Sequence, residues 1–175
     1  LNECDLAPVY IQGVYGQDLS DDELKKFYKE EAAKATIGRA LGHGEIGCFL
    51  SHLNIYFKML NDNVKYALIL EDDIELKFDI KLIIDELLIS SSHWEIVLLG
   101  HHSRFSRTEP TLPSFWGRKK LSKKYSLSRP CDLGQGTYGY LISLAGAKKM
   151  LKFSNKIDRP IDHYTGSDQF TNLYI

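Results

Sequence analysis

Residues 66–73 read YALILEDD, and this stretch decides the fold that we expect. The run Tyr66–Leu70 is apolar without a break, which is typical of a strand covered on both faces, as in a parallel sheet between helices. A second such run, residues 95–99 (EIVLL), follows a helical pattern over about 79–89. Because helices and buried strands alternate, the sequence predicts an α/β fold whose mostly parallel sheet is flanked by helices.

Further elements lie on both sides of this unit. Ser20, with Glu23 three residues later, predicts a capping box at the start of a helix. Residues 45–61 carry apolar side chains at helical spacing round most of the circumference, which predicts a helix buried inside the domain. Residues 138–142 predict a strand, and Ser143 is expected to cap a helix through about residue 153. Residues 8–16 (PVYIQGVYG) predict a short strand that runs into a turn, and the part of the chain after this last helix is expected to be loop.

The composition is that of a folded globular protein. Of the 175 residues, 43% are apolar and 26% are charged, which argues against a disordered or fibrous chain. The 22 Lys and Arg residues balance 23 Asp and Glu, and the resulting net charge of −1 argues against nucleic acid as a partner. We find no internal repeat and expect one domain over residues 1–175.

Cysteine usage and hydropathy predict a reducing, cytoplasmic setting. The cysteines are Cys4, Cys48 and Cys131, an odd number at wide spacings that fits neither a disulfide framework nor a Cys-x-x-Cys zinc site. The longest uncharged run, residues 46–57, is too short to cross a bilayer. No basic segment followed by an apolar stretch stands at the start, so we expect no signal peptide.

The most informative feature is the acidic triplet Glu71-Asp72-Asp73, which follows the first apolar strand directly. Adjacent carboxylates repel one another unless water or a cation neutralises them, and ligands of open α/β sheets bind beyond the carboxyl ends of the strands. If the segment is extended, Glu71 and Asp73 point the same way and could bind one cation. Mg²⁺ and Mn²⁺ prefer such oxygen ligands. The alternative is a solvated acidic turn.

Three sequence blocks together resemble glycosyltransferase family 25. They are residues 44–52 (GEIGCFLSH), residues 66–76 (YALILEDDIEL) and residues 137–151 (TYGYLISLAGAKKML). The family includes bacterial lipooligosaccharide galactosyl- and glucosyltransferases and has relatives in collagen glycosylation. The resemblance covers about residues 8–165. Family members begin with a strand that holds the nucleotide base and continue further at the other end, so the resemblance implies that parts of both family termini are missing from, or not shown in, this sequence.

The resemblance implies a GT-A-like (Rossmann-like) fold and a metal-assisted transfer of a hexose. The donor would be a UDP-sugar, UDP-galactose above all, and the acceptor a lipooligosaccharide or another glycan, with inversion at the anomeric carbon. The acidic triplet would hold Mn²⁺ (or Mg²⁺) against the diphosphate, because a metal lowers the cost of the charge that develops on departing UDP. Asp73 is the first choice of ligand and Glu71 the second, with Asp72 supporting the substrate.

The other two family blocks imply residues that shape the donor pocket. Glu45 and His52 are seven apart, so they share one helix face; the simpler interpretation of His52 is a hydrogen-bonded core residue. Thr137, Tyr138 and Tyr140 match the third block, with Gly136 in the turn before it, although a strand tyrosine often serves packing alone. His101 and His102 follow the second apolar strand, where one of them could contact substrate.

An inverting transferase needs a carboxylate or a His to accept the proton of the acceptor hydroxyl, and the segment 159–163 (RPIDH) holds a candidate carboxylate. The resemblance places a Pro-x-Asp here, which makes Asp162 the leading catalytic candidate and Asp168 the reserve. His163 is a candidate for a further metal ligand. The alternative is a surface loop with an ordinary solvated acid.

Residues 117–129 (GRKKLSKKYSLSR) hold six basic residues and no acid, and we expect a long irregular basic loop. Such a loop is either simply solvated or attracted to anionic lipid headgroups or to a phosphorylated glycan, which would bring the enzyme to the inner face of the inner membrane. From another functional class, a non-catalytic homologue that binds glycans or partners stays open. Receiver-type and haloacid-dehalogenase proteins also place acids at strand ends, but the pattern of acids here does not fit them.

Overall fold

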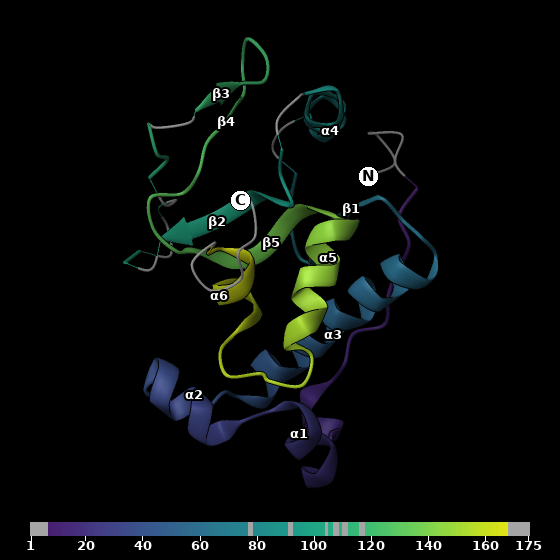
Figure 1. Cartoon of the computed structure of the whole chain (residues 1–175), viewed down its shortest axis with the longest axis vertical. Coiled ribbons are helices and arrows are strands. Elements are labelled where there is room, and N and C mark those ends of the chain that lie inside the picture. The colour runs from purple at the N-terminus through teal and green to yellow at the C-terminus, as the bar shows by residue number, and fades with distance from the viewer. Residues whose placement is uncertain are drawn as a thin grey trace.

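The protein is a mixed α/β fold built round a three-stranded antiparallel sheet (Figure 1). Our computed structural model describes residues 7–76, 79–90, 93–103, 105–106, 109, 112–115 and 118–167. The strands are β1 (Tyr66–Leu70), β2 (Ile96–Ser103) and β5 (Gly134–Ser143), in the order β1-β5-β2. The mixture of helices and strands is confirmed.

The predicted mostly parallel sheet is wrong for the part of the chain that the structure describes. β1 and β2 are joined through α4 (Ile80–Ile89) and do run in the same direction. They are not neighbours, however, because β5 lies between them and pairs antiparallel with both: Tyr140 is opposite Ile69 on one side and Leu98 on the other. The strand over residues 138–142 was predicted and is part of β5, but its position between β1 and β2 was not predicted.

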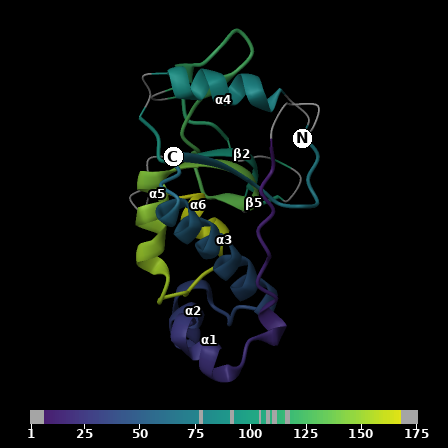
Figure 2. The same ribbon diagram turned by 90° about the vertical axis from the view of Figure 1, so that its right-hand side faces the viewer.

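Helices cover both faces of the sheet (Figure 2). Besides α4, the described helices are α1 (Asp21–Phe27), α2 (Glu30–Ile37), α3 (His43–Asn61), α5 (Leu144–Met150) and α6 (Ile161–Thr165), with short 3₁₀ turns at Gly16–Asp18 and Leu151–Phe153. Of these, α1 and α2 lie at the far end of the molecule, away from the sheet. Figure 2 shows α4 on one side of the sheet and α3, α5 and α6 on the other. Tyr140 and Ile142 of β5 pack into the core on the α3 side, and Leu141 packs into the smaller core beneath α4.

Several helix starts follow the local signals in the sequence. Ser20 and Glu23 form the predicted capping box at the start of α1. The Asp79 carboxylate accepts a hydrogen bond from the backbone N–H of Leu82 at 3.0 Å, and the Ser143 hydroxyl accepts one from Gly146 at 3.1 Å. Each side chain satisfies a backbone donor that the first helical turn leaves without a partner.

Burial differs from the prediction in β1 and in α3. β1 lies at the edge of the described sheet and Tyr66 is 48% exposed, so β5, whose residues 139–143 are buried in succession, is the strand covered on both faces. In α3, Phe49 and Tyr56 are fully buried, but Phe57 is 47% exposed. An apolar run therefore marked the right elements without telling which of them is central.

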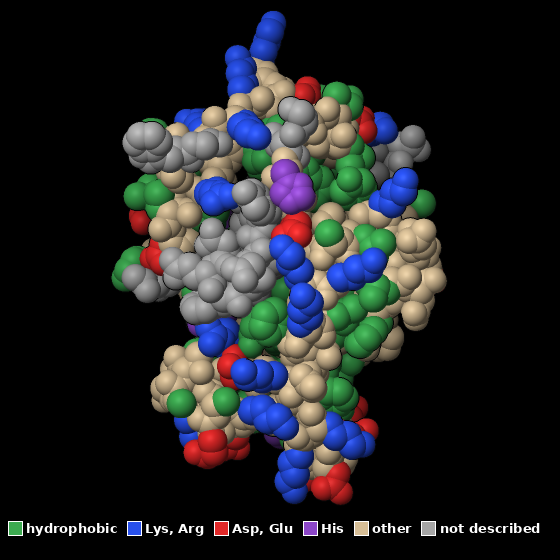
Figure 3. Space-filling view, viewed as in Figure 1, with side chains coloured by type: hydrophobic (Ala, Val, Ile, Leu, Met, Phe, Trp, Pro, Cys, Tyr) green, Lys and Arg blue, Asp and Glu red, His purple; other side chains and the backbone are tan. Residues whose placement is uncertain are grey.

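The basic segment is a hairpin, which corrects the expected irregular loop for residues 118–129. β3 (Lys119–Lys120) pairs antiparallel with β4 (Ser126–Leu127). The hairpin packs on the core beneath α4 through its apolar side chains Leu121, Tyr125 and Leu127. This packing gives the segment a fixed position. Figure 3 shows Lys and Arg side chains projecting from this end of the molecule. Among the described residues no helix is both long and apolar enough to span a bilayer.

Candidate active site

One edge of the sheet gathers most of the residues that the sequence predicts to be functional. The ends of β1 and β2 meet the start of β5 there, and α6 contacts both β5 and α3. Burial, and then the negative charges of Glu71, Asp162 and Glu45, raise the pKa of the Cys48 thiol, which places these carboxylates within electrostatic range of one thiol. The predicted residues brought to this edge are Glu45, His52, Glu71, Gly136, Thr137, Tyr140, Asp162 and His163.

Glu71 is held against β5 by both its backbone and its side chain. Its N–H donates to the carbonyl oxygen of Tyr138 at 3.1 Å, which extends the β1–β5 ladder by one bond. Its carboxylate accepts a short hydrogen bond from the hydroxyl of Thr137, a residue only 5% exposed. These contacts turn Glu71 toward α3.

Asp72 and Asp73 follow Glu71 in a turn, so the extended alternation expected over residues 71–73 stops at Glu71. Both carboxylates are exposed, and neither makes a hydrogen bond or ion pair with any residue that the structure describes. They are exposed carboxylates directly after Glu71 in the chain, and this suits Mg²⁺ or Mn²⁺, which take carboxylates together with water and phosphate.

A bulge in β5 brings Thr137 and Tyr140 onto the same face. The register of β5 against β2 shifts between Gly100 and His102. Although they are three residues apart, Thr137 therefore reaches Glu71 while the Tyr140 hydroxyl lies 2.7 Å from Nδ1 of His52 on α3. Strict strand alternation would have placed them on opposite faces.

Tyr138 lies outside this group. It is 39% exposed, and its hydroxyl lies 2.9 Å from Nδ1 of His102. The pair joins β5 to β2 next to the site. The sequence predicted that one of His101 and His102 could contact substrate there.

His52 is a buried, hydrogen-bonded core residue, which agrees with the simpler interpretation of the sequence, but its links to Tyr140 and Tyr56 were not predicted. The Tyr140 hydroxyl, already bonded to His52, also lies 2.6 Å from the Tyr56 hydroxyl. Burial lowers the pKa of His52 to about 4 and raises the pKa of the Cys48 thiol to about 11. Both side chains are therefore neutral at pH 7. The spacing of His52 and Tyr56, one helical turn apart in an apolar helix, was the signal available in the sequence.

The neutral state of His52 predicts a loss of stability in acid. Its pKa of about 4 in the folded state is below the ordinary value of 6.5, so the unfolded chain binds more protons between these values and the free energy of unfolding falls as the pH drops through them. The full difference is about 3 kcal/mol. Urea unfolding at pH 7 and pH 4.5, in chelator, should show a smaller loss in His52→Gln than in wild type. Equal losses in the two proteins would contradict the assignment.

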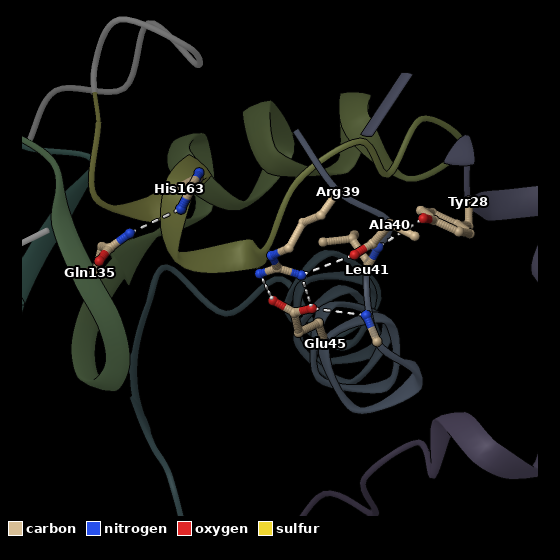
Figure 4. Close-up of polar contacts among 8 residues, drawn as sticks. Tyr28, Arg39, Ala40, Leu41, Glu45, Gln135 and His163 are labelled. Atoms are coloured by element: carbon tan, nitrogen blue, oxygen red, sulfur yellow. Dashed lines mark hydrogen bonds and ion pairs between the residues drawn. The ribbon is translucent and has the colours of Figure 1, made fainter. Parts of the chain in front are cut away.

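Glu45 has a structural role that its helix position did not reveal (Figure 4). Its two carboxylate oxygens each accept a hydrogen bond from Arg39 at 2.7 Å, and one also accepts the N–H of Gly42 at 2.9 Å. The Arg39 pair holds the pKa of Glu45 below its usual range. Glu45 thus closes the first turn of α3, and Arg39, which the sequence analysis missed, is positioned beside the site in the glycine-containing loop before the helix.

Asp162 and His163 lie on α6, a helix where the sequence predicted loop. The N–H of Gly136 donates to Oδ2 of Asp162 at 3.0 Å, whereas Oδ1 is buried without a hydrogen-bond partner among the described residues. His163 Nε2 lies 3.1 Å from Nε2 of Gln135 (Figure 4), and burial lowers the pKa of His163. The reserve candidate Asp168 lies outside the described residues.

Gly136 is required by the geometry that presents this N–H. Its φ is +94°, in the left-handed region that side chains other than glycine rarely adopt. A Cβ added there would also lie 2.7 Å from the ring of Tyr138. The glycine before Thr137 was predicted to shape a turn, and here it directs a backbone donor at a carboxylate.

Comparison with known proteins agrees with the sequence blocks. Residues 5–165 match the family model described as glycosyltransferase family 25 (LPS biosynthesis protein). Procollagen galactosyltransferase 1-B of Xenopus laevis is 36% identical over 152 residues, covering 81% of this chain and 23% of its own length. Procollagen galactosyltransferase 2 of Homo sapiens is 28% identical over 162 residues, covering 86% and 24%.

A third relative is named differently. The inactive glycosyltransferase 25 family member 3 of Mus musculus is 27% identical over 175 residues, covering 93% of this chain and 27% of its own length. The chain thus spans about a quarter of each of these relatives. Since the family model matches nearly the whole sequence, the resemblance seen in the three blocks is confirmed, and this chain belongs to glycosyltransferase family 25.

Proposed function

We propose that the chain is a glycosyltransferase that moves a hexose from a UDP-sugar to a hydroxyl of a glycan acceptor. One observation carries the proposal: adjacent residues of β5 bind two carboxylates that come from distant parts of the chain. Thr137 donates to Glu71 at the end of β1, and Gly136 donates to Asp162 on α6. The acidic strand end and the candidate base therefore face one site, which is the pair of groups that a metal-assisted displacement needs.

Asp162 is suited to act as general base. Gly136 fixes Oδ2, so that Oδ1, buried and without a described partner, is the atom free to accept a proton. In the reaction the acceptor oxygen attacks the anomeric carbon, its proton passes to Asp162, and the bond to UDP breaks on the opposite face, which inverts the configuration. His52, Tyr140 and Glu45, with their contacts to the surrounding elements, shape the donor side.

The residues present also fit a divalent ion. Asp73 and Asp72 offer exposed carboxylates, and Glu71 offers a carboxylate of which Thr137 engages one oxygen. We propose Asp73 and Glu71 as the residues that hold Mn²⁺ or Mg²⁺, with His163 as a further candidate from α6 and Asp72 beside the donor. The ion, when bound, supplies positive charge for the diphosphate.

Galactose is the proposed hexose, because relatives that match this chain are named galactosyltransferases. A lipooligosaccharide is the proposed acceptor, in line with the family's description as LPS biosynthesis proteins, and procollagen, named by the relatives, is the second acceptor to test. The basic hairpin over residues 118–129 would attract anionic lipid headgroups and bring the enzyme to a membrane surface. A cytoplasmic location at the inner membrane is part of the same proposal.

A non-catalytic glycan- or partner-binding role is the second candidate. It is favoured by the mouse relative named inactive, which matches 93% of the chain. The two candidates differ in turnover: only the enzyme releases UDP.

A donor screen separates them. We expect UDP release from UDP-galactose that requires Mn²⁺ or Mg²⁺, stops in EDTA and rises with the true acceptor, lipooligosaccharide or procollagen. Asp73→Ala should remove most of this turnover, since it deletes a proposed ligand. Glu75→Gln, an exposed acid just beyond the triplet, is the matched control and should keep it. A full-length protein that binds and turns over no sugar nucleotide under any of these conditions is not the proposed enzyme.

A further inference from the structure

Three different metal-ligand side chains converge between α3 and the end of β1. Cys48 and His52 lie one turn apart on α3, and Glu71 follows β1. The Cys48 Sγ, one His52 ring nitrogen and one Glu71 carboxylate oxygen all lie within 4.8 Å of one another. A single ion could contact all three after small side-chain movements, because metal-to-ligand distances in such sites are about 2.0–2.3 Å.

The donor set selects the kind of ion. A thiolate, an imidazole and a carboxylate together suit Zn²⁺, whereas Mg²⁺ and Mn²⁺ prefer oxygen ligands. We propose that Cys48, His52 and Glu71 form a zinc site in which the ion fastens α3 to the end of β1. When Glu71 binds this zinc ion, Asp73 and Asp72 remain as the oxygen ligands of the Mn²⁺ or Mg²⁺ ion. The fourth position of a tetrahedral ion is left for water or for a substrate oxygen.

Two outer residues already orient the ligands. The Thr137 hydroxyl donates a hydrogen bond to one carboxylate oxygen of Glu71. The Tyr140 hydroxyl lies 2.7 Å from Nδ1 of His52, so Nε2 is the nitrogen left to coordinate the ion. Bound histidines commonly use the second nitrogen in this way, donating its N–H to an oxygen. The Tyr140 hydroxyl can rotate so that its oxygen accepts the Nδ1–H of His52 while its own proton points to the Tyr56 hydroxyl.

Binding exchanges a proton for the metal. The neutral Cys48 thiol must lose its proton to become a ligand, so Zn²⁺ binding releases one proton and tightens as the pH rises. No oxidant or reductant is involved. The proposal does not depend on sugar transfer, because the ion is measured on the protein without substrate.

Cobalt reports the ligands directly. In the Cys4→Ser/Cys131→Ser protein, Cys48 is the one remaining cysteine of the three. We expect Co²⁺ alone to give a thiolate-to-metal charge-transfer band and the intense visible bands of a four-coordinate ion, and one equivalent of Zn²⁺ to abolish them. Adding Cys48→Ser should remove the charge-transfer band, and Glu71→Gln should weaken Zn²⁺ binding in competition with a chromophoric chelator. Thr137→Val should weaken it by roughly 10- to 100-fold.

Two further measurements use the protein with all three ligands intact, so they test the site even if a ligand variant fails to fold. Zn²⁺ should slow alkylation of Cys48 in the folded protein that keeps this cysteine, and it should raise the unfolding temperature, as any ligand of the native state does. The Cys131→Ser variant, which alters an exposed cysteine, should behave as wild type in both. A protein whose Co²⁺ spectrum lacks the thiolate band, or whose Cys48 alkylates at the same rate with and without Zn²⁺, has no such site, whether or not it transfers sugars.

Discussion

Replacing Asp162 by asparagine is expected to lower kcat by roughly 10²- to 10⁴-fold, the usual contribution of general acid–base catalysis. Asparagine keeps an oxygen that can accept the Gly136 N–H, which now binds Oδ2 at 3.0 Å, so the position of α6 should persist. It cannot, however, accept the proton of the attacking hydroxyl. Steady-state kinetics with UDP-galactose and the acceptor found in the donor screen, together with circular dichroism, measure both effects.

The control for this substitution is Asp85→Asn, an exposed acid on α4 across the sheet from the site. This variant makes the same chemical change, and its kcat should equal that of the wild type within experimental error. The pH profile gives a second check: the limb assigned to the base should disappear in Asp162→Asn and remain in Asp85→Asn. If Asp162→Asn keeps kcat within a factor of about three, the base is another group and the role proposed for Asp162 is wrong.

Replacing Gly166 by alanine should destabilise the protein by about 3 kcal/mol, at the upper end of the cost of overpacking. Gly166 ends α6, and its own N–H bonds the carbonyl of Asp162 at 2.9 Å. An added Cβ would lie 1.8 Å from the carbonyl oxygen of Gly134 and 2.8 Å from that of Asp162. Both neighbours are backbone atoms at the site, so α6 or β5 must move. Thermal unfolding should show a drop of roughly 6–12 °C.

The matched control is Gly44→Ala in the first turn of α3. A Cβ added there meets nothing within 4 Å. Because alanine lowers the conformational entropy of the unfolded chain, this variant should be more stable than wild type by up to about 1 kcal/mol. Because Gly166→Ala shifts α6, it should also lower turnover in the fraction that stays folded. Similar unfolding temperatures for the two alanine variants would show that the close approach of Gly166 to Gly134 does not constrain the native structure.

Part of the site was predictable because some signals are local to the chain. The acidic triplet at the end of β1 was predicted from its place after an apolar strand, whereas the Thr137–Tyr140 block and Asp162 were predicted from the family resemblance. The sequence missed Arg39 and the Tyr56 hydroxyl, since an arginine in a loop and a tyrosine in an apolar helix look ordinary until a partner stands beside them. It also expected Glu71 and Asp73 to share a face, an expectation that the turn at 72–73 removes.

The sequence alone determined where the elements lie: β1 at Tyr66–Leu70, the capping box of α1 and most of α3 follow from neighbouring residues through apolar periodicity and caps. Only the tertiary structure decided that β5 enters between β1 and β2, that its bulge turns both Thr137 and Tyr140 toward α3, and that Cys48, His52 and Glu71 meet. The reason is physical. Local signals act over a few residues, whereas strand order and side-chain convergence depend on contacts between distant segments, which no periodicity within one segment encodes.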